Sequence, residues 1–293
     1  MERVMMRIII KTKNIPARVS CSIFLYTILL FTENYKLLMR PYILVTNDDG
    51  ADAHGILVLT KLMMQLGDVL VVAPDGPRSG QSNAITVNDP VKARLVEKKD
   101  GLTRYTCTGT PTDCTKLAFD SLAERKIDLV VAGINHGSNA AINVIYSGTM
   151  GAALEGCEHG VPSIGFSISD HSPRADFSFF ESHILRISEE TIKNSLPKNV
   201  CLNVNAPIGP LKGIRISRQC RGQWMKEFEK RTDPHGRDYF WLTGHFENFE
   251  PDAEDTDEWA LANGYVSVVP TTIDLTAHKF IHEMEKWELS SIF

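Results

Sequence analysis

Two adjacent carboxylates at the end of an apolar run are the side chains of this sequence best suited to chemistry. Asp48 and Asp49 follow residues 42–46, a short apolar run typical of a buried parallel strand. Ligands of open α/β sheets bind where such strands end. Neighbouring carboxylates repel each other there unless a cation joins them, so we expect both to hold a hard divalent metal ion. Taken alone, Asp48-Asp49-Gly50 could instead form the N-cap and turn of a following helix.

Polar residues also follow later apolar runs. Residues 68–74 and 127–133 both have the pattern of buried strands, and Ser79 and Asn135 lie in the loops after them. In a doubly wound sheet these strand ends converge on one crevice. Two carboxylates, a hydroxyl and an amide oxygen make a shell suited to Mg²⁺ or Mn²⁺. The structural alternatives are serines that stabilise their own turn, including Ser82, and an Asx turn at Asn135. Convergence at successive strand ends favours the metal site.

A hydroxyl- and glycine-rich segment, Ser147-Gly148-Thr149, lies at the start of a helix predicted over residues 148–156. The free backbone N–H groups of a helix N-terminus attract anions, so this segment is suited to a phosphate group. Simple capping by Ser147 or Thr149 is the structural alternative, and capping and anion binding can coexist. The segment 109–113 also starts a helix, and we assign it a structural role.

Asp274 and His278 are four residues apart, a spacing that a helix would place on one face. A terminal helix is predicted over residues 276–289. A histidine held by a carboxylate is suited to general acid or base catalysis, and an exposed helical ion pair is the structural alternative. The sequence contains no Cys/His zinc pattern, so zinc is not expected.

The order of the predicted elements defines the fold class. Strands alternate with helices from residue 41, which predicts a mostly parallel sheet with helices on both faces. The right-handed crossover rule makes this a Rossmann-like, doubly wound α/β sheet. Besides the strands already named, the pattern predicts strands at residues 162–167, 199–205 and 264–270, and helices at residues 55–64, 113–123 and 182–195.

The pattern changes after residue 206. Predicted strands at residues 213–217 and 239–242 flank turn residues at 233–236, which predicts a β-hairpin. Residues 247–258 are rich in Asp and Glu, a composition typical of a solvated loop.

Composition narrows the class of protein. With 293 residues, 43% of them apolar and 23% charged, the chain is expected to form one large globular domain or two coupled lobes. A formal charge of −5 argues against nucleic-acid binding, which needs a basic face. The six cysteines form no CxxC pair, a pattern that favours free thiols in a reducing compartment and hence a cytoplasmic location.

The first 38 residues differ from the rest of the chain. They are basic at the start and contain an apolar run, residues 20–31, that is too short to span a bilayer comfortably, so no membrane partner is expected. No small-x-small cleavage site follows this run. We therefore expect a non-native or disordered leader over residues 1–38 and a natural start at Met39, with an exported protein as the alternative.

The motifs occur in order from about Met39 almost to the end of the chain. They are Asn47-Asp48-Asp49-Gly50, Ala73-Pro74-Asp75 with Ser79-Gly80, Gly109-Thr110-Pro111, Gly133-Ile134-Asn135 with Asn139, Tyr146-Ser147-Gly148-Thr149, Gly264-Tyr265-Val266-Ser267 and Asp274-Leu275-Thr276-Ala277-His278. Together they closely resemble the SurE (survival protein E) family of metal-dependent 5′/3′-nucleotidases. On this resemblance, residues 39–293 form one nucleotidase domain, with a core over about 41–215 and a hairpin arm and C-terminal elements over about 216–293.

The resemblance implies an activity and a set of site residues. It implies hydrolysis of nucleoside 5′- or 3′-monophosphates, and of other phosphoesters including short polyphosphate, with one Mg²⁺ or Mn²⁺ per subunit. It also implies a homodimer or homotetramer in which the arm, around residues 218–245, and the last helix dock on a neighbouring subunit. The implied metal ligands are Asp48, Asp49, Ser79 and Asn135, the phosphate residues Asn139, Ser147, Gly148 and Thr149, and the catalytic residues Asp48, Asp274 and His278.

Two other classes of protein are alternatives to this one. A nicotinamide-dependent oxidoreductase is disfavoured because the first strand–helix turn lacks GxGxxG and carries two negative charges where a pyrophosphate needs N–H groups. A non-catalytic metal or nucleotide sensor would use the same ligands, so the sequence alone leaves that alternative open.

Overall fold

The computed structural model describes residues 40–172, 174–287 and 289. The leader predicted over residues 1–38 lies outside the described residues. Within the described part of the chain, no helix is long and apolar enough to cross a membrane.

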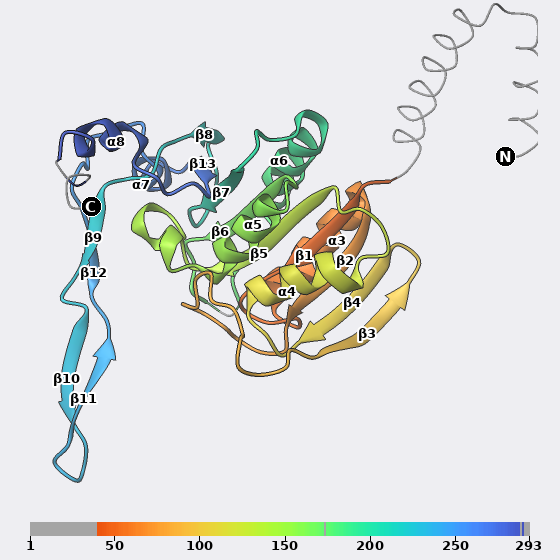
Figure 1. Ribbon diagram of the computed structural model, residues 1–293, viewed down its shortest axis with the longest axis horizontal. Coiled ribbons are helices and arrows are strands. Elements are labelled where there is room, and N and C mark those ends of the chain that lie inside the picture. Colours follow the sequence, from red (N-terminus) through yellow and green to blue (C-terminus); the bar gives the residue numbers. More distant parts are fainter. Residues whose placement is uncertain (1–39, 173, 288, 290–293) are drawn as a thin grey trace, which may run out of the picture. The chain divides into compact units, whose positions relative to one another are not determined.

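A nine-stranded sheet forms the centre of the fold (Figure 1). Its strands in chain order are β1 (Tyr42–Thr46), β2 (Asp68–Pro74), β3 (Ala93–Lys99), β4 (Leu102–Cys107), β5 (Leu129–His136), β6 (Ser163–Ile168), β7 (Val200–Ala206), β8 (Ile214–Ile216) and β13 (Val266–Thr272). Six neighbouring strands, in the order β4-β2-β1-β5-β6-β7, run parallel. This is the strand order of a Rossmann sheet, so the predicted α/β fold with a mostly parallel sheet is confirmed.

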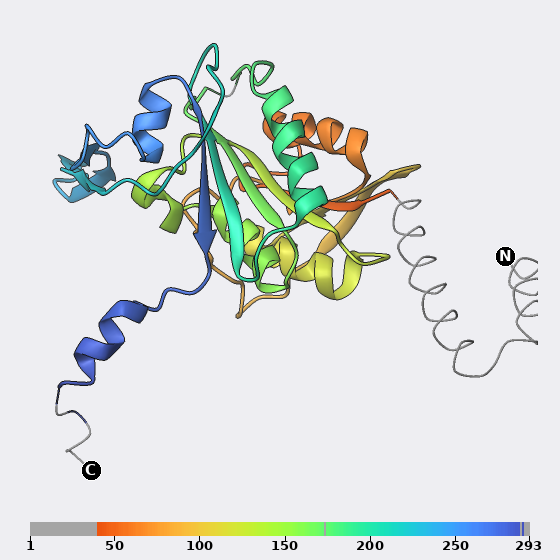
Figure 2. The same cartoon turned by 90° about the horizontal axis from the view of Figure 1, so that it is seen from above.

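Four helices cover the two faces of the parallel sheet. They are α3 (His54–Leu66), α4 (Pro111–Leu117), which continues into η1 (Ala118–Leu122), α5 (Gly148–Glu158) and α6 (Glu181–Asn194). Helices α3 and α6 lie on one face, and α4 and α5 lie on the other (Figure 2). The side chains of β1 alternate accordingly: Ile43 and Val45 belong to one buried cluster, and Leu44 belongs to the second. Burial on both faces explains why the parallel strands are continuous apolar runs.

In the C-terminal part of the sheet, the strands run opposite to the six parallel strands. Strand β13 pairs antiparallel with β7 and parallel with β8. The remaining elements are η2 (Ala141–Ile145), β9 (Gly222–Met225), β10 (Phe228–Thr232), β11 (Asp238–Leu242), β12 (His245–Asn248), α7 (Asp257–Ala262) and α8 (His278–Met284). Strands β9–β12 form two antiparallel pairs outside the main sheet, and residues 222–248 are called the arm below.

Three predictions for this region were wrong in part. The strand predicted at residues 213–217 belongs to the main sheet, and the partner of β11 across the turn is β10. The acidic residues 247–258 do not form one solvated loop, because they include the end of β12 and the start of α7, where Asp257 is fully buried. The terminal helix begins at His278, so Asp274 precedes it.

Candidate active site

The site lies at the switch point of the sheet, between β1 and β5, where neighbouring strands connect in opposite directions. The loops that follow β1 and β2 contact each other directly. Ala51 N–H donates to the carbonyl of Pro74 at 2.8 Å, and Arg78 N–H donates to the carbonyl of Asp48 at 2.7 Å. The second bond places Ser79, an exposed residue, in the loop segment held against Asp48.

The turn after β1 is built by Asn47, which leaves the two aspartates for another task. The Asn47 amide donates to the carbonyl of Gly50 at 2.9 Å and accepts from the Gly50 N–H at 3.2 Å. Gly50 has φ +106°, a conformation that favours glycine. Helix α3 has Ala53 at its N-cap and no side-chain cap. The N-cap alternative for Asp48 and Asp49 is therefore wrong.

The N-terminus of α5 packs against Asp48. A Cβ atom on Gly148 would lie 2.9 Å from Asp48 Cβ, so only glycine allows this approach. The hydroxyl of Thr149 donates to Asp48 Oδ1 at 2.5 Å. Ser147 is the N-cap, and its Oγ accepts the Met150 N–H at 3.0 Å. Capping is therefore present, beside the candidate carboxylate.

Burial makes the two carboxylates costly as anions. Asp48 is 4% exposed, and burial raises its pKa to about 6, with the bond from Thr149 opposing the rise and the charge of Asp49 adding to it. Burial also raises the pKa of Asp49, and His136 offsets part of that rise. Among the described residues, Asp49 Oδ2 is buried without a hydrogen-bond partner. An orphaned carboxylate oxygen beside a second buried carboxylate fits a cation as the missing partner.

The other candidate ligands have oxygen atoms suited to the same cation. The Asn135 amide nitrogen donates to the carbonyl of Gly137 at 2.8 Å, which leaves its Oδ1 as an acceptor. The Asx-turn alternative is not observed, because the Gly137 N–H donates to the carbonyl of Ile168 and not to Asn135 Oδ1. The amide bond to Gly137 orients the Asn135 side chain. Carboxylate, amide and hydroxyl oxygens form a donor set typical of Mg²⁺ or Mn²⁺.

Asn139 is held by a buried polar network that the sequence reasoning missed. Its amide nitrogen donates to Ser167 Oγ at 2.7 Å, and its backbone N–H donates to Asn205 Oδ1 at 2.7 Å. Asn203 Nδ2 donates to the carbonyl of Asn139 at 2.8 Å, and Asn205 Nδ2 donates to Asn203 Oδ1 at 2.9 Å. The sequence feature that could have revealed this network is the pair Asn203 and Asn205 in an otherwise apolar strand. Alternate positions of a strand lie on one face, so the two side chains are neighbours.

Asp274 and His278 contact each other but lie far from Asp48 within this chain. His278 Nε2 and Asp274 Oδ2 are 2.7 Å apart. Because β13 runs antiparallel to β7, its last residue, Thr272, pairs with Val200, the first residue of β7. Asp274 therefore follows a residue at the amino ends of the parallel strands, whereas Asp48 lies at their carboxyl ends. The seven residues of β13 separate the amino ends of the strands from the carboxyl ends, where the candidate site lies, by about 20 Å. The predicted pair exists, and its own chain does not bring it to the site.

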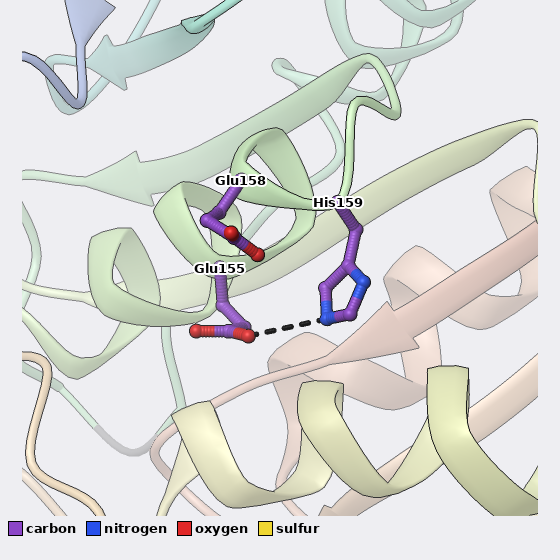
Figure 3. A group of neighbouring side chains, drawn as sticks. All are labelled: Glu155, Glu158 and His159. Atoms are coloured by element: carbon purple, nitrogen blue, oxygen red, sulfur yellow. Dashed lines mark ion pairs between the residues drawn. The ribbon is translucent and has the colours of Figure 1, made fainter.

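A second acidic group lies at the other end of α5. Figure 3 shows Glu155, Glu158 and His159, whose potential ligand atoms lie within 4.8 Å of one another. Glu155 already pairs with Lys116 at 2.7 Å and with His159 at 3.3 Å, so its charge is neutralised. The helix separates this group from Ser147 by about 15 Å, at 1.5 Å per residue. We therefore treat it as a surface ion-pair cluster.

The fold and the candidate site define a Rossmann-like α/β protein in which the carboxylate of Asp48 lies at the switch point, against the N-terminus of α5. The family profile described as Survival protein SurE matches residues 43–226. The 5′-nucleotidase SurE of Bacteroides thetaiotaomicron is 52% identical over 248 residues, which cover 84% of this chain and 95% of that protein. That of Phocaeicola vulgatus is 50% identical over 251 residues, which cover 85% and 98%.

A solved structure agrees with these relatives. The crystal structure of the SurE protein from Aquifex aeolicus matches with a TM-score of 0.73 at 35% identity, covering 85% of this chain and all of that one (100%). The chain belongs to the SurE family, and the resemblance inferred from its motifs is confirmed.

Proposed function

We propose that this protein hydrolyses nucleoside 5′-monophosphates with a divalent cation held by Asp48, Asp49, Ser79 and Asn135. The observation that carries the proposal is the buried, unpartnered carboxylate oxygen of Asp49 beside the buried carboxylate of Asp48 at the switch point. The close relatives are named 5′-nucleotidases, and the chain is an enzyme of that hydrolase class. Mg²⁺ and Mn²⁺ both suit the proposed donor set.

A cation bound there supplies positive charge to the phosphate ester and acidifies water. The chain supplies the remaining electrostatic contacts. The first backbone N–H groups of α5, at Gly148 and Thr149, have no partner within the helix and suit the phosphate oxygens. The Ser147 hydroxyl accepts from Met150 and keeps its own hydrogen to donate. The second amide hydrogen of Asn139 is likewise available, since Ser167 takes only one.

The Asp274–His278 pair suits protonation of the leaving oxygen only if it reaches the crevice of another subunit. We propose a homodimer or homotetramer in which the arm and α8 are exchanged. Supporting this, no residue of α8 is buried, and Phe240, Trp241 and Leu242 on β11 are exposed by 59%, 59% and 70%. Apolar exposure of this kind marks an interaction surface.

Subunit exchange has a direct test by complementation. Asp48→Asn and His278→Ala proteins are each expected to be weakly active. In a mixed oligomer, exchange combines an intact Asp48 from one chain with an intact His278 from the other, so activity returns on mixing and reassembly. If the reassembled mixture is no more active than its two components, the pair does not act across subunits.

The function itself is tested by phosphate release from AMP with Mg²⁺, with Mn²⁺ and with EDTA. We expect turnover with either ion, none with EDTA, and loss of most activity in Asp48→Asn with the fold retained. Parallel assays with 3′-AMP and tripolyphosphate define the range of phosphoesters accepted. Nucleotide binding without phosphate release from any of these substrates would make the protein a sensor and overturn the proposal.

The cellular location is proposed from the cysteines. Five described cysteines, Cys107, Cys114, Cys157, Cys201 and Cys220, are buried free thiols. Free thiols suit a reducing compartment, so we propose a cytoplasmic location.

A further inference from the structure

One buried carboxylate joins the candidate phosphate-binding loop to the arm. The loop comprises residues 137–147, between β5 and α5, and is called the phosphate loop below. Asp257, the first residue of α7, is 0% exposed. Its Oδ2 accepts the Ala141 N–H at 2.8 Å, and its Oδ1 accepts the N–H groups of Cys220 at 2.8 Å and Glu258 at 2.9 Å. The side chain therefore contacts the phosphate loop, the base of the arm and its own helix at once.

The bond to Ala141 holds the loop in an unusual backbone conformation. Ala141 has φ +50°, and it is fully buried two residues after Asn139. Residues with a Cβ adopt this left-handed region only where the surrounding structure holds them there. The Asp257 carboxylate accepts the N–H of Ala141 and so helps to hold Ala141 in this conformation.

A second bond links the same two parts. Trp224 on β9, at the base of the arm, donates its Nε1–H to Asn143 Oδ1 at 2.7 Å. Asn143 lies in η2, the short helix that starts at Ala141. The phosphate loop thus contacts the arm base through a direct side-chain bond and through the shared carboxylate.

We propose that Asp257 is a positioning residue for the phosphate site: it holds the phosphate loop in its binding conformation and ties that conformation to the arm. The inference rests on the phosphate role proposed above for Asn139. A carboxylate is required because both oxygens accept from different segments. An amide in its place would turn an NH₂ group toward one of these N–H donors and break one tie.

The test compares two affinities of the full chain by calorimetry: Mn²⁺ alone, and inorganic phosphate added to the Mn²⁺-loaded protein. For Asp257→Asn we expect phosphate binding about tenfold weaker, the effect of one lost buried hydrogen bond. Mn²⁺ affinity should stay within about twofold, because the carboxylates of Asp48 and Asp49, which follow β1, make no hydrogen bond to Asp257. Asp257→Asn/Ala141→Gly should recover part of the phosphate affinity, since glycine accepts φ +50° without restraint.

Asp255→Asn is the matched control, because the same chemical change falls two residues away on a side chain 67% exposed and paired with Arg218. It should bind both ions like the wild type. Unchanged phosphate affinity in Asp257→Asn overturns the proposal, and so does an equal weakening of Mn²⁺ and phosphate binding, which would indicate general structural damage.

If Asp257→Asn does not fold, Trp224→Phe removes only the hydrogen bond between Trp224 and Asn143. About threefold weaker phosphate binding is then expected, and wild-type affinity overturns the proposal. Failure of the wild-type protein to bind phosphate or release it from AMP would instead remove the proposed function.

Discussion

Replacing Asp48 with asparagine should stabilise the metal-free protein while removing its response to metal. The folded-state pKa of Asp48 is about 6, against 3.8 for the free side chain. Because the folded pKa is raised, the charged form costs stability, and that cost grows as pH rises from about 4 to about 6 and is complete above it. The difference between a pKa of 3.8 and one of about 6 corresponds to about 3 kcal/mol. Asparagine carries no charge, and its amide oxygen can still accept the Thr149 hydroxyl.

The assay is thermal unfolding in EDTA and in excess Mn²⁺ at pH 7.5. In EDTA, Asp48→Asn should unfold about 6–12 °C above the wild type, since 1 kcal/mol corresponds to about 2–4 °C for a domain of this size. In excess Mn²⁺ the wild type should unfold at the higher temperature, because only the wild type is stabilised by binding the metal. Asp52→Asn, in the same loop with its side chain 90% exposed, serves as the control and should change neither value. A metal-free Asp48→Asn protein that is less stable than the wild type would refute the reasoning.

Three further substitutions test the packing around the site. Thr149→Val removes the hydroxyl that orients Asp48, so Mn²⁺ affinity in calorimetry should fall about tenfold; an unchanged affinity would mean that this bond does not support the metal site. Gly148→Ala should lower kcat/KM for AMP about a hundredfold, because the new Cβ would meet Asp48 at 2.9 Å and shift it. Gly76→Ala, with no atom within 4 Å of its Cβ, is the control, and equal activity of the two variants would contradict the steric argument. Gly55→Ala places a Cβ against the carbonyl oxygen of Ile134 in β5 and should cost about 3 kcal/mol in urea unfolding; wild-type stability of this variant would contradict the argument.

Five of the six parallel strands, β1, β2, β5, β6 and β7, could be predicted from the sequence because both faces of that part of the sheet are buried. Strands such as β1 and β5 are continuous apolar runs, and their ends carry the polar residues that mark the crevice. Strands β3 and β4 were both missed. Strand β3 is an exposed edge strand rich in charge, and β4 has a mixed sequence, LTRYTC, that is only partly buried in its middle. The order of the strands, and so the switch point itself, depends on pairings that no local pattern encodes.

Sequence reasoning could not place the site residues whose position depends on strand direction or on long-range hydrogen bonds. The contact between Asp274 and His278 follows from local spacing, and it is present. Their distance from Asp48 depends on β13 running antiparallel, which the sequence does not reveal. Asp257 was assigned to a solvated acidic segment because composition predicts exposure, yet N–H donors from distant segments compensate its burial.

The pairing of the buried Asp48 and the partly buried Asp49 with a cation is the central claim, and anomalous X-ray scattering from a crystal soaked in Mn²⁺ tests it most directly. The account predicts one strong peak per chain, in contact with a carboxylate oxygen of Asp48 and with the Asp49 oxygen that has no partner among the described residues. A crystal with no peak between these residues, or with manganese bound only at Glu155 and His159, would contradict it.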